Sequence, residues 1–207
     1  MLLLRVELPD RPGALGHVAT AMGTVGADIS AIEIVEKHGD GSVIDDFILT
    51  MPPGSLAETI ISACAEVPDV RVLWLSRYPD QWNIESDIEA INRMSKHRGR
   101  AAQILTDDAT TVFRCEWAAL VNRQTREVVH ATDKAPEFTP AQIDALGDLS
   151  APVRREMGAD WMPDWGEVTV AGAPVDEQRT LLLGRQGGPA FLDSELFRLE
   201  HLASAAR

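Results

Sequence analysis

The residues best suited to chemistry lie near the start of the chain, in the run Asp10-Arg-Pro-Gly-Ala-Leu15. Pro12 and Gly13 place bare backbone at the start of an expected helix, where free N–H groups and the helix dipole favour a carboxylate. Asp10 comes directly before that turn, and Asp28 opens the strand expected after the helix. Amide donors beside carboxylates suit a zwitterion, because the amides hold the ligand's carboxylate and the acids hold its ammonium. The pattern therefore predicts binding of a free amino acid.

Other roles compete for the same acids. Asp10 would serve only as a helix cap, and Asp28 only as the end of a turn, if the segment is purely structural. A hard cation is a further alternative, but Ca²⁺ takes about six to eight oxygen ligands and only Asp45 and Asp46 offer more. We expect those two to be simple turn or strand-surface acids. Because the paired carboxylates Asp10 and Asp28 raise the local negative charge, they favour an ammonium or basic ligand over an acidic one.

The elements that position these residues follow a βαββαβ order within about the first 78 residues, the arrangement of ferredoxin-like folds. Apolar and β-branched runs predict strands at 2–8, 29–35, 42–51 and 70–78. The first helix is expected to bury Leu15, Val18, Ala19, Met22 and Val25, and Gly26 stands where a C-terminal glycine belongs. The second helix is expected to start with a capping box of Ser55 and Glu58 and to bury Leu56, Ile60, Cys64 and Val67.

The run D-R-P-G-A-L, the later G-A-D-I-S and this element order together resemble the ACT domain. The resemblance implies that residues 1–78 bind an amino acid at an interface between paired domains and regulate amino-acid metabolism, although many ACT domains only mediate assembly. In amino-acid-binding members, the positions of Asp10 and Gly13 grip the ligand, and the position of Asp28 contributes from the partner subunit. Serine-binding members usually carry asparagine at the two aspartate positions. The ligand-binding residues implied are Asp10, Arg11, Gly13, Ala14, Leu15, Asp28 and Ile29.

The second half, residues 84–207 after a linker at 79–83, is expected to form a different fold. Its pattern predicts a long helix over 84–105, strands at 111–121, 128–131, 167–171 and 180–185, and a final helix capped by Asp193. Thr139 and Gln142 form a capping box around Pro140. The long opening helix and the ending from Leu182 to Leu196 resemble a GAF-like domain, which implies an α+β fold with a central antiparallel sheet. Trp117, Trp161 and Trp165 would line a pocket there, but aromatic residues at such spacing more often form core.

Composition narrows the function. The 207 residues carry a net charge of -13 and a pI near 4.7, which disfavours nucleic acid as a partner. The start of the chain does not have the pattern of a signal peptide, and no apolar run approaches the roughly 20 residues that span a bilayer. The two cysteines, Cys64 and Cys115, are expected in the cores of a helix and a strand, as in a reduced cytoplasmic protein. The five histidines are scattered, and no metal, cofactor or catalytic motif is evident.

We therefore expect an amino-acid-binding regulator rather than an enzyme, assembled as a homodimer or larger homo-oligomer with its ligand at the paired ACT domains. In this interpretation the GAF-like domain passes the signal on. One alternative is a regulatory subunit permanently bound to a metabolic enzyme, as in the ACT-bearing small subunits of acetohydroxyacid synthase. A second alternative is an enzyme with its pocket in residues 84–207.

Overall fold

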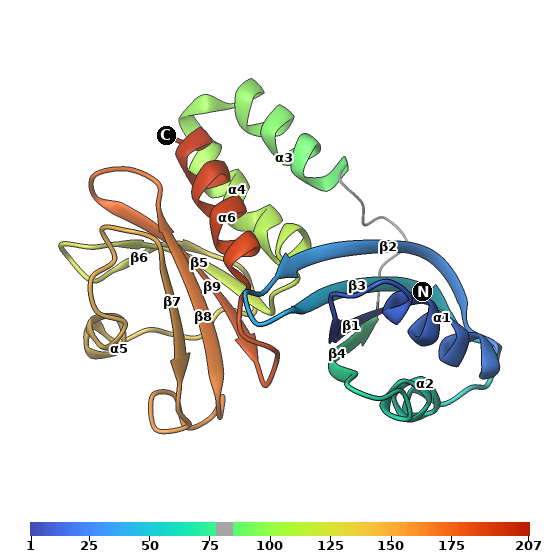
Figure 1. Ribbon diagram of the computed structural model, residues 1–207. Coiled ribbons are helices and arrows are strands. Elements are labelled where there is room, and N and C mark those ends of the chain that lie inside the picture. The colour runs from blue at the N-terminus through green and yellow to red at the C-terminus, as the bar shows by residue number, and fades with distance from the viewer. Residues whose placement is uncertain (78–84) are drawn as a thin grey trace. The chain divides into compact units, whose positions relative to one another are not determined.

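The computed structural model describes residues 1–77 and 85–207, and the chain divides into two compact units, Met1–Gln81 and Trp82–Arg207 (Figure 1). The expected linker at 79–83 lies outside the described residues, as does the expected end of the last strand of the first half at residue 78. One unit holds a four-stranded sheet and the other a five-stranded sheet, both antiparallel. The α+β class expected from the sequence is confirmed.

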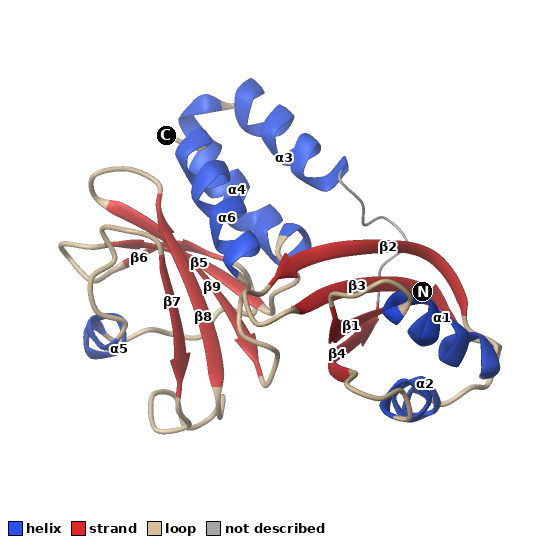
Figure 2. Ribbon diagram, in the orientation of Figure 1, coloured by secondary structure: helices blue, strands red, loops and turns tan. Residues whose placement is uncertain are grey.

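The first unit packs two helices on one face of its sheet, whose strand order is β2-β3-β1-β4 (Figure 2). Its elements are β1 (Leu2–Pro9), α1 (Ala14–Thr24), β2 (Asp28–Lys37), β3 (Ser42–Thr50), α2 (Ala57–Ala65) and β4 (Arg71–Arg77). Inward residues of β1 and β3 alternate with outward ones and meet the helices in one apolar core. This core contains Leu4, Val6, Leu8, Val18, Met22, Phe47, Ile60 and Cys64.

Helix α1 ends as expected at Gly26, whose φ of 77° only glycine adopts readily. The Gly26 amide donates to the Gly23 carbonyl at 3.0 Å, and the Ala27 amide donates to Met22 at 3.1 Å, the paired bonds of a Schellman motif. The predicted buried stripe is partly wrong. It runs through Ala14, Val18 and Met22, four residues apart, and leaves Leu15 36% exposed.

The predicted capping box of the second helix is wrong. Helix α2 begins at Ala57 with Leu56 as its N-cap, and no side chain caps it. Ser55 instead closes the preceding turn, because its amide donates to the Pro52 carbonyl at 3.1 Å. Leu56 is 69% exposed rather than buried, whereas Ile60 is buried as expected.

The second unit has strand order β6-β5-β9-β8-β7, with every neighbouring pair antiparallel. Its elements are α3 (Glu85–Lys96), the 3₁₀ turn η1 (Arg98–Arg100), α4 (Ala101–Val112), β5 (Trp117–Asn122), β6 (Val128–Ala131), α5 (Pro140–Ala145), β7 (Val153–Met157), β8 (Val168–Pro174), β9 (Arg179–Gln186) and α6 (Asp193–Ala205). The capping box at the start of α5 is confirmed, since the Thr139 side chain and the Gln142 side chain each accept from the other's backbone amide.

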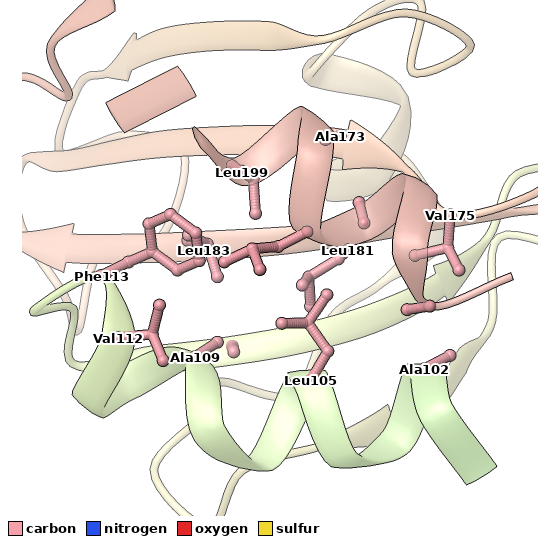
Figure 3. Close-up of a cluster of buried hydrophobic side chains, with 14 of the residues drawn as sticks. Ala102, Leu105, Ala109, Val112, Phe113, Ala173, Val175, Leu181, Leu183 and Leu199 are labelled. Atoms are coloured by element: carbon pink, nitrogen blue, oxygen red, sulfur yellow. The ribbon is translucent and has the colours of Figure 1, made fainter. Parts of the chain in front are cut away.

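Both faces of this sheet are covered. Helices α4 and α6 lie against one face, where Leu105, Leu199, Leu181 and Leu183 meet (Figure 3). Alternate residues of the same strands point to the opposite face and pack with α5 and the segments around it. Trp117 is on that second face, and Gly184 directly opposite it makes room, because a Cβ there would lie 1.9 Å from the indole ring.

Three predictions for this unit are wrong. The final helix has Leu192 as its N-cap, so Asp193 is its first residue rather than its cap. The expected helix over 84–105 is two helices joined at 97–100, where Gly99 lowers helix propensity and a 3₁₀ turn replaces the regular winding. The expected strand over 111–121 begins only at Trp117, because α4 continues to Val112. Cys115 therefore lies before the strand rather than in it. Strand β7 was not expected, because three consecutive charged residues interrupt its apolar pattern.

Candidate functional site

The N-terminus of α1 presents bare backbone, as the sequence predicts. Gly13 is the N-cap residue, with φ of 91° and no side-chain cap. The Ala14 amide donates to the Arg11 carbonyl at 3.2 Å, and the His17 amide donates to the Gly13 carbonyl at 3.1 Å. The first-turn amides of Leu15 and Gly16 lie between them. Helix geometry gives these two donors no carbonyl one turn earlier. The space beside Gly13 is open, since a Cβ there would meet nothing within 4 Å. This end of the helix can therefore donate to a carboxylate.

Asp10 lies beside this helix end and forms a weak ion pair. Its backbone amide donates to the Gly41 carbonyl at 2.8 Å, which fixes the end of β1. Its carboxylate accepts from Lys37 Nζ at 2.9 Å, with the side chains 45% and 59% exposed. Exposed pairs of this kind contribute between about 0 and 1 kcal/mol. A competing ammonium can therefore displace Lys37 from Asp10 at little cost.

The remaining predicted residues divide into two places. Arg11 is exposed and its guanidinium lies 3.7 Å from Asp69, while Ala14 is buried and Leu15 is partly exposed in the first turn of α1. Asp28 and Ile29 lie at the other end of the sheet. Asp28 pairs with Thr50 and Pro9 pairs with Ser42, so eight residues of β3, roughly 27 Å, separate the two ends. Within one chain, Asp28 and Asp10 are therefore too far apart to contact the same amino acid.

Asp45 is a functional candidate that the sequence reasoning placed on the surface. It occupies an inward position of β3, between Val43 and Phe47, and is 2% exposed. Its Oδ1 atom is buried without a hydrogen-bond partner. Burial raises the pKa of the Asp45 carboxyl to about 6; the nearby Asp46 and Asp10 carboxylates add to the rise and Lys37 opposes it. The signal that could have identified this position as inward is its spacing of two residues from both Val43 and Phe47, because residues two apart in a strand share one face.

Asp46 is also buried, at 2% exposed, but on the opposite face of the sheet and with a partner. Its two carboxylate oxygens accept from Arg5 Nε at 2.7 Å and from a terminal nitrogen of the same guanidinium at 2.9 Å. The Trp74 ring lies 5.8 Å from this guanidinium. The expectation that Asp45 and Asp46 are surface acids is therefore wrong for both, but only Asp46 has an evident structural role.

The aromatic residues of the second unit form core. Trp117 is fully buried, and its ring lies 5.3 Å from that of Phe138, which lies 6.2 Å from Trp161. Trp161 is held in place by a 2.9 Å hydrogen bond from its indole nitrogen to the Gln142 carbonyl. Trp165 packs against the same cluster. These side chains fill the face of the sheet where they would otherwise line a pocket.

Open hollows on the described surface of the second unit include the following pair. The larger of the two, about 450 Å³, is lined by three glycines and Ala190 together with Met157, Val168, Thr169 and the acids Glu156 and Glu167. The smaller, about 220 Å³, contains Arg126, whose guanidinium pairs with Asp144 at 2.5 Å, and Arg123, which donates to backbone carbonyls. The charged side chains of the smaller hollow are thus already engaged within the protein.

Metal binding and thiol reactivity are both disfavoured in the described parts of the chain. No group of three or more His, Cys, Asp or Glu side chains there is placed to hold a metal ion. Burial raises the pKa of the Cys64 thiol to about 11 and, as the main cause, that of Cys115 to about 12, which disfavours the reactive thiolate. Across residues 1–77 and 85–207, every helix is too short or too polar to cross a bilayer.

Comparison with known proteins finds no matching family model and no matching curated protein. Among solved structures, a formyltetrahydrofolate deformylase from Pseudomonas putida KT2440 is similar over 46% of this chain, with 10% identity and a TM-score of 0.33. The similar part spans 38% of that protein. An unknown protein from Galdieria sulphuraria is similar over 99% of this chain and 87% of its own, with 12% identity and a TM-score of 0.33. Similarity this weak identifies neither a family nor an activity.

Proposed function

We propose that residues 1–78 form an ACT domain, that this domain binds a free amino acid at a homodimer interface, and that the protein is a regulator. The βαββαβ element order and the strand order β2-β3-β1-β4 support a ferredoxin-like arrangement for this unit. The D-R-P-G-A-L run lies at the open N-terminus of α1, where its backbone amides and Asp10 are adjacent. This adjacency of donors and a displaceable carboxylate is the observation that carries the proposal.

The edge strand β2 supports the homodimer. It is ten residues long, ends the sheet, and exposes 40% of Ile32 and 56% of Ile34. Long apolar edge strands tend to pair with another strand. If β2 pairs antiparallel with its copy about a two-fold axis near its midpoint, Asp28 of the partner subunit comes opposite Lys37, beside Asp10. Two copies would thus join the two groups of site residues that one chain keeps apart.

In this arrangement the amides of Leu15 and Gly16 bind the carboxylate of the amino acid. Asp10 and Asp28 of the partner subunit bind its ammonium, with Lys37 displaced. Binding then favours the paired state, because the complete site exists only in the dimer. The second unit, which we propose is GAF-like, would transmit this preference; its sheet has both faces filled by core, which suits transmission better than a second ligand pocket.

The rival role, a regulatory subunit permanently bound to a metabolic enzyme, has one supporting observation. Ile88 and Ile91 of α3 and Phe197 of α6 are 60%, 46% and 65% exposed, and exposed apolar side chains of this size suit a protein partner. Co-purification of one enzyme at fixed stoichiometry, lost in Phe197→Ser, would favour this role over a free sensor.

A thermal-shift screen of the purified full-length protein against the twenty amino acids tests the main proposal. A ligand present at about 100 times its dissociation constant adds about 2.7 kcal/mol to the free energy of unfolding. The variant Asp28→Ala should lose the shift while keeping the unliganded fold, and Glu58→Gln, which removes an exposed charge from α2, should keep it. Gly13→Val should also lose the shift, but with a lower unliganded melting temperature, because residue 13 has φ of 91°. Unchanged affinity in both site variants, or no response of the wild type to any amino acid, would refute the assignment.

A further inference from the structure

Asp45 breaks the apolar pattern of β3 at a position where a carboxylate is costly. Val43, Phe47 and Leu49 share its face and belong to the core under α1 and α2. An inward carboxylate without a hydrogen-bond partner costs several kcal/mol relative to an apolar side chain of similar size. The neighbouring Asp46 shows how the same sheet stabilises a buried acid, through two short hydrogen bonds from one arginine. Asp45 Oδ1 has no such donor.

Asp45 also lies close to the candidate amino-acid site. On β3 it pairs with Val6 of β1 and with Ile34 of β2, one strand in from the open edge of the sheet. The charges of Asp10 and Lys37 both act on its carboxyl, which places it within electrostatic reach of the weak ion pair at the start of α1. On the edge strand β2, the residue next to Asp45 is Ile34, whose side chain is 56% exposed. Ile34 and Lys37 are both exposed side chains on the edge strand, so a long ligand side chain entering from this edge can displace them.

Asp10, Asp45 and Asp28 of the partner subunit outnumber Lys37, so the site keeps a net negative charge when a zwitterion binds, and this favours one more cation. The first-turn amides of α1 balance the ligand's carboxylate, and Asp10 with Asp28 of the partner subunit balance its ammonium. The Asp45 carboxylate then still has no partner. Lys37 shows that the site accepts a primary ammonium, since its Nζ already lies 2.9 Å from Asp10. A free ligand with a flexible chain and a terminal cation supplies the same group without the constraint of the strand.

We propose that the ligand is an amino acid with a cationic side chain, and that Asp45 is the specificity-determining residue that receives the cation. This inference rests on the proposed function. A charge-assisted hydrogen bond to a buried carboxylate is worth about 1.5 to 3 kcal/mol, which corresponds to roughly a ten- to hundredfold preference over the neutral analogue. Asp45 is thus a position where the chain loses stability in the free state and gains ligand affinity.

Isothermal titration of the full-length protein with L-lysine, L-arginine and L-norleucine tests this assignment. Norleucine has the length and α-amino acid group of lysine but no terminal cation. The wild type should bind lysine or arginine roughly tenfold or more tightly than norleucine. Asp45→Asn should remove that preference and bind the basic ligands with the weak affinity of norleucine, while Glu58→Gln should behave as the wild type. Thermal stability of the unliganded Asp45→Asn protein, measured alongside, should equal or exceed that of the wild type.

The outcomes separate the two proposals. If the wild type binds a neutral amino acid as tightly as lysine and arginine, or if Asp45→Asn keeps the preference, the role of Asp45 is wrong and the amino-acid sensor stands. If the unliganded Asp45→Asn protein is less stable than the wild type, Asp45 is structural, and the specificity role is overturned. If none of the twenty amino acids nor norleucine binds, the proposed function fails and the specificity assignment fails with it.

Discussion

Replacing Asp45 with asparagine should stabilise the first unit, and the gain should grow with pH. The pKa of the Asp45 carboxyl rises from 3.8 to about 6 on folding because the group is buried. The folded state therefore holds this proton more tightly than the unfolded state does. Between these two pKa values the free energy of unfolding of the wild type falls as pH rises, because deprotonation is easier in the unfolded chain. Asparagine has no charge and escapes this penalty.

The linkage relation gives the size of the effect. With pKa values of 3.8 and about 6, the penalty on the wild type is about 2 kcal/mol at pH 5 and about 3 kcal/mol at pH 7.5. The asparagine amide is itself imperfectly satisfied, which lowers the net gain at both pH values. The imperfect hydrogen bonding of the amide is the same at both pH values, so it cancels in the difference between the two measurements, which should be about 1 kcal/mol. The pI near 4.7 makes pH 5 a practical lower limit, since proteins associate near zero net charge.

Urea unfolding of the full-length protein at pH 5 and pH 7.5 measures this difference, with hydrogen exchange to assign the transition that involves β1 and β3. Asp46→Asn is the matched control, because it removes the same charge from the adjacent residue. Asp46 pairs with Arg5, so this change should lower the free energy of unfolding by about 3 kcal/mol or more. A gain for Asp45→Asn that does not change with pH, or a loss at pH 7.5, would refute the account of a buried, unpaired carboxylate.

The second unit and the first helix give three further predictions. Glu195→Gln should lower the free energy of unfolding of the second unit by about 3 kcal/mol in urea titrations, because it leaves the buried Arg185 without its ion-pair partner at 2.7 Å. Gly184→Ala should destabilise the same unit by at least about 1 to 3 kcal/mol and alter near-ultraviolet circular dichroism, since the new methyl group overlaps the Trp117 ring. Gly26→Ala should cost about 1 kcal/mol or more by thermal unfolding, because residue 26 has φ of 77°. Wild-type stability in any of these variants would contradict the corresponding packing or backbone argument.

The first unit was predictable where short-range chemistry decides the structure. Gly26 ends α1 because a left-handed residue is needed there, and glycine supplies it at least cost. Ser55 shows the limit of the same reasoning. Its side chain fits a capping box, but the turn that starts at Pro52 takes its backbone amide, and the helix starts two residues later. When a turn and a capping box overlap in the sequence, the residue pattern alone does not show which of the two will form.

The second unit was harder to predict because its elements are defined by packing. Trp117 lies in a strand that the apolar pattern extends backwards into α4, since buried helices and buried strands are both rich in apolar residues. Strand β7 contains three consecutive charged residues, Arg154, Arg155 and Glu156. Its sequence therefore lacks the apolar pattern that would predict a strand, although it pairs with β8. For the candidate site, the segment from Asp10 to Leu15 was found by its residues alone. The distance between Asp28 and Asp10 depends on the register in which β1 and β2 pair with β3, and the sequence alone does not determine that register.

The two adjacent aspartates of β3 show how function and stability can be told apart in one strand. Asp46 has an arginine partner, so its burial is explained by the fold. Asp45 has a buried oxygen without a partner, and its neighbours Val43 and Phe47 show that an apolar residue would fit the pattern. A residue that lowers stability in the free protein persists most readily where a bound state recovers the loss. Because Asp45 lies near Asp10 and the open end of α1, a cationic ligand at that site is the simplest bound state that would do so.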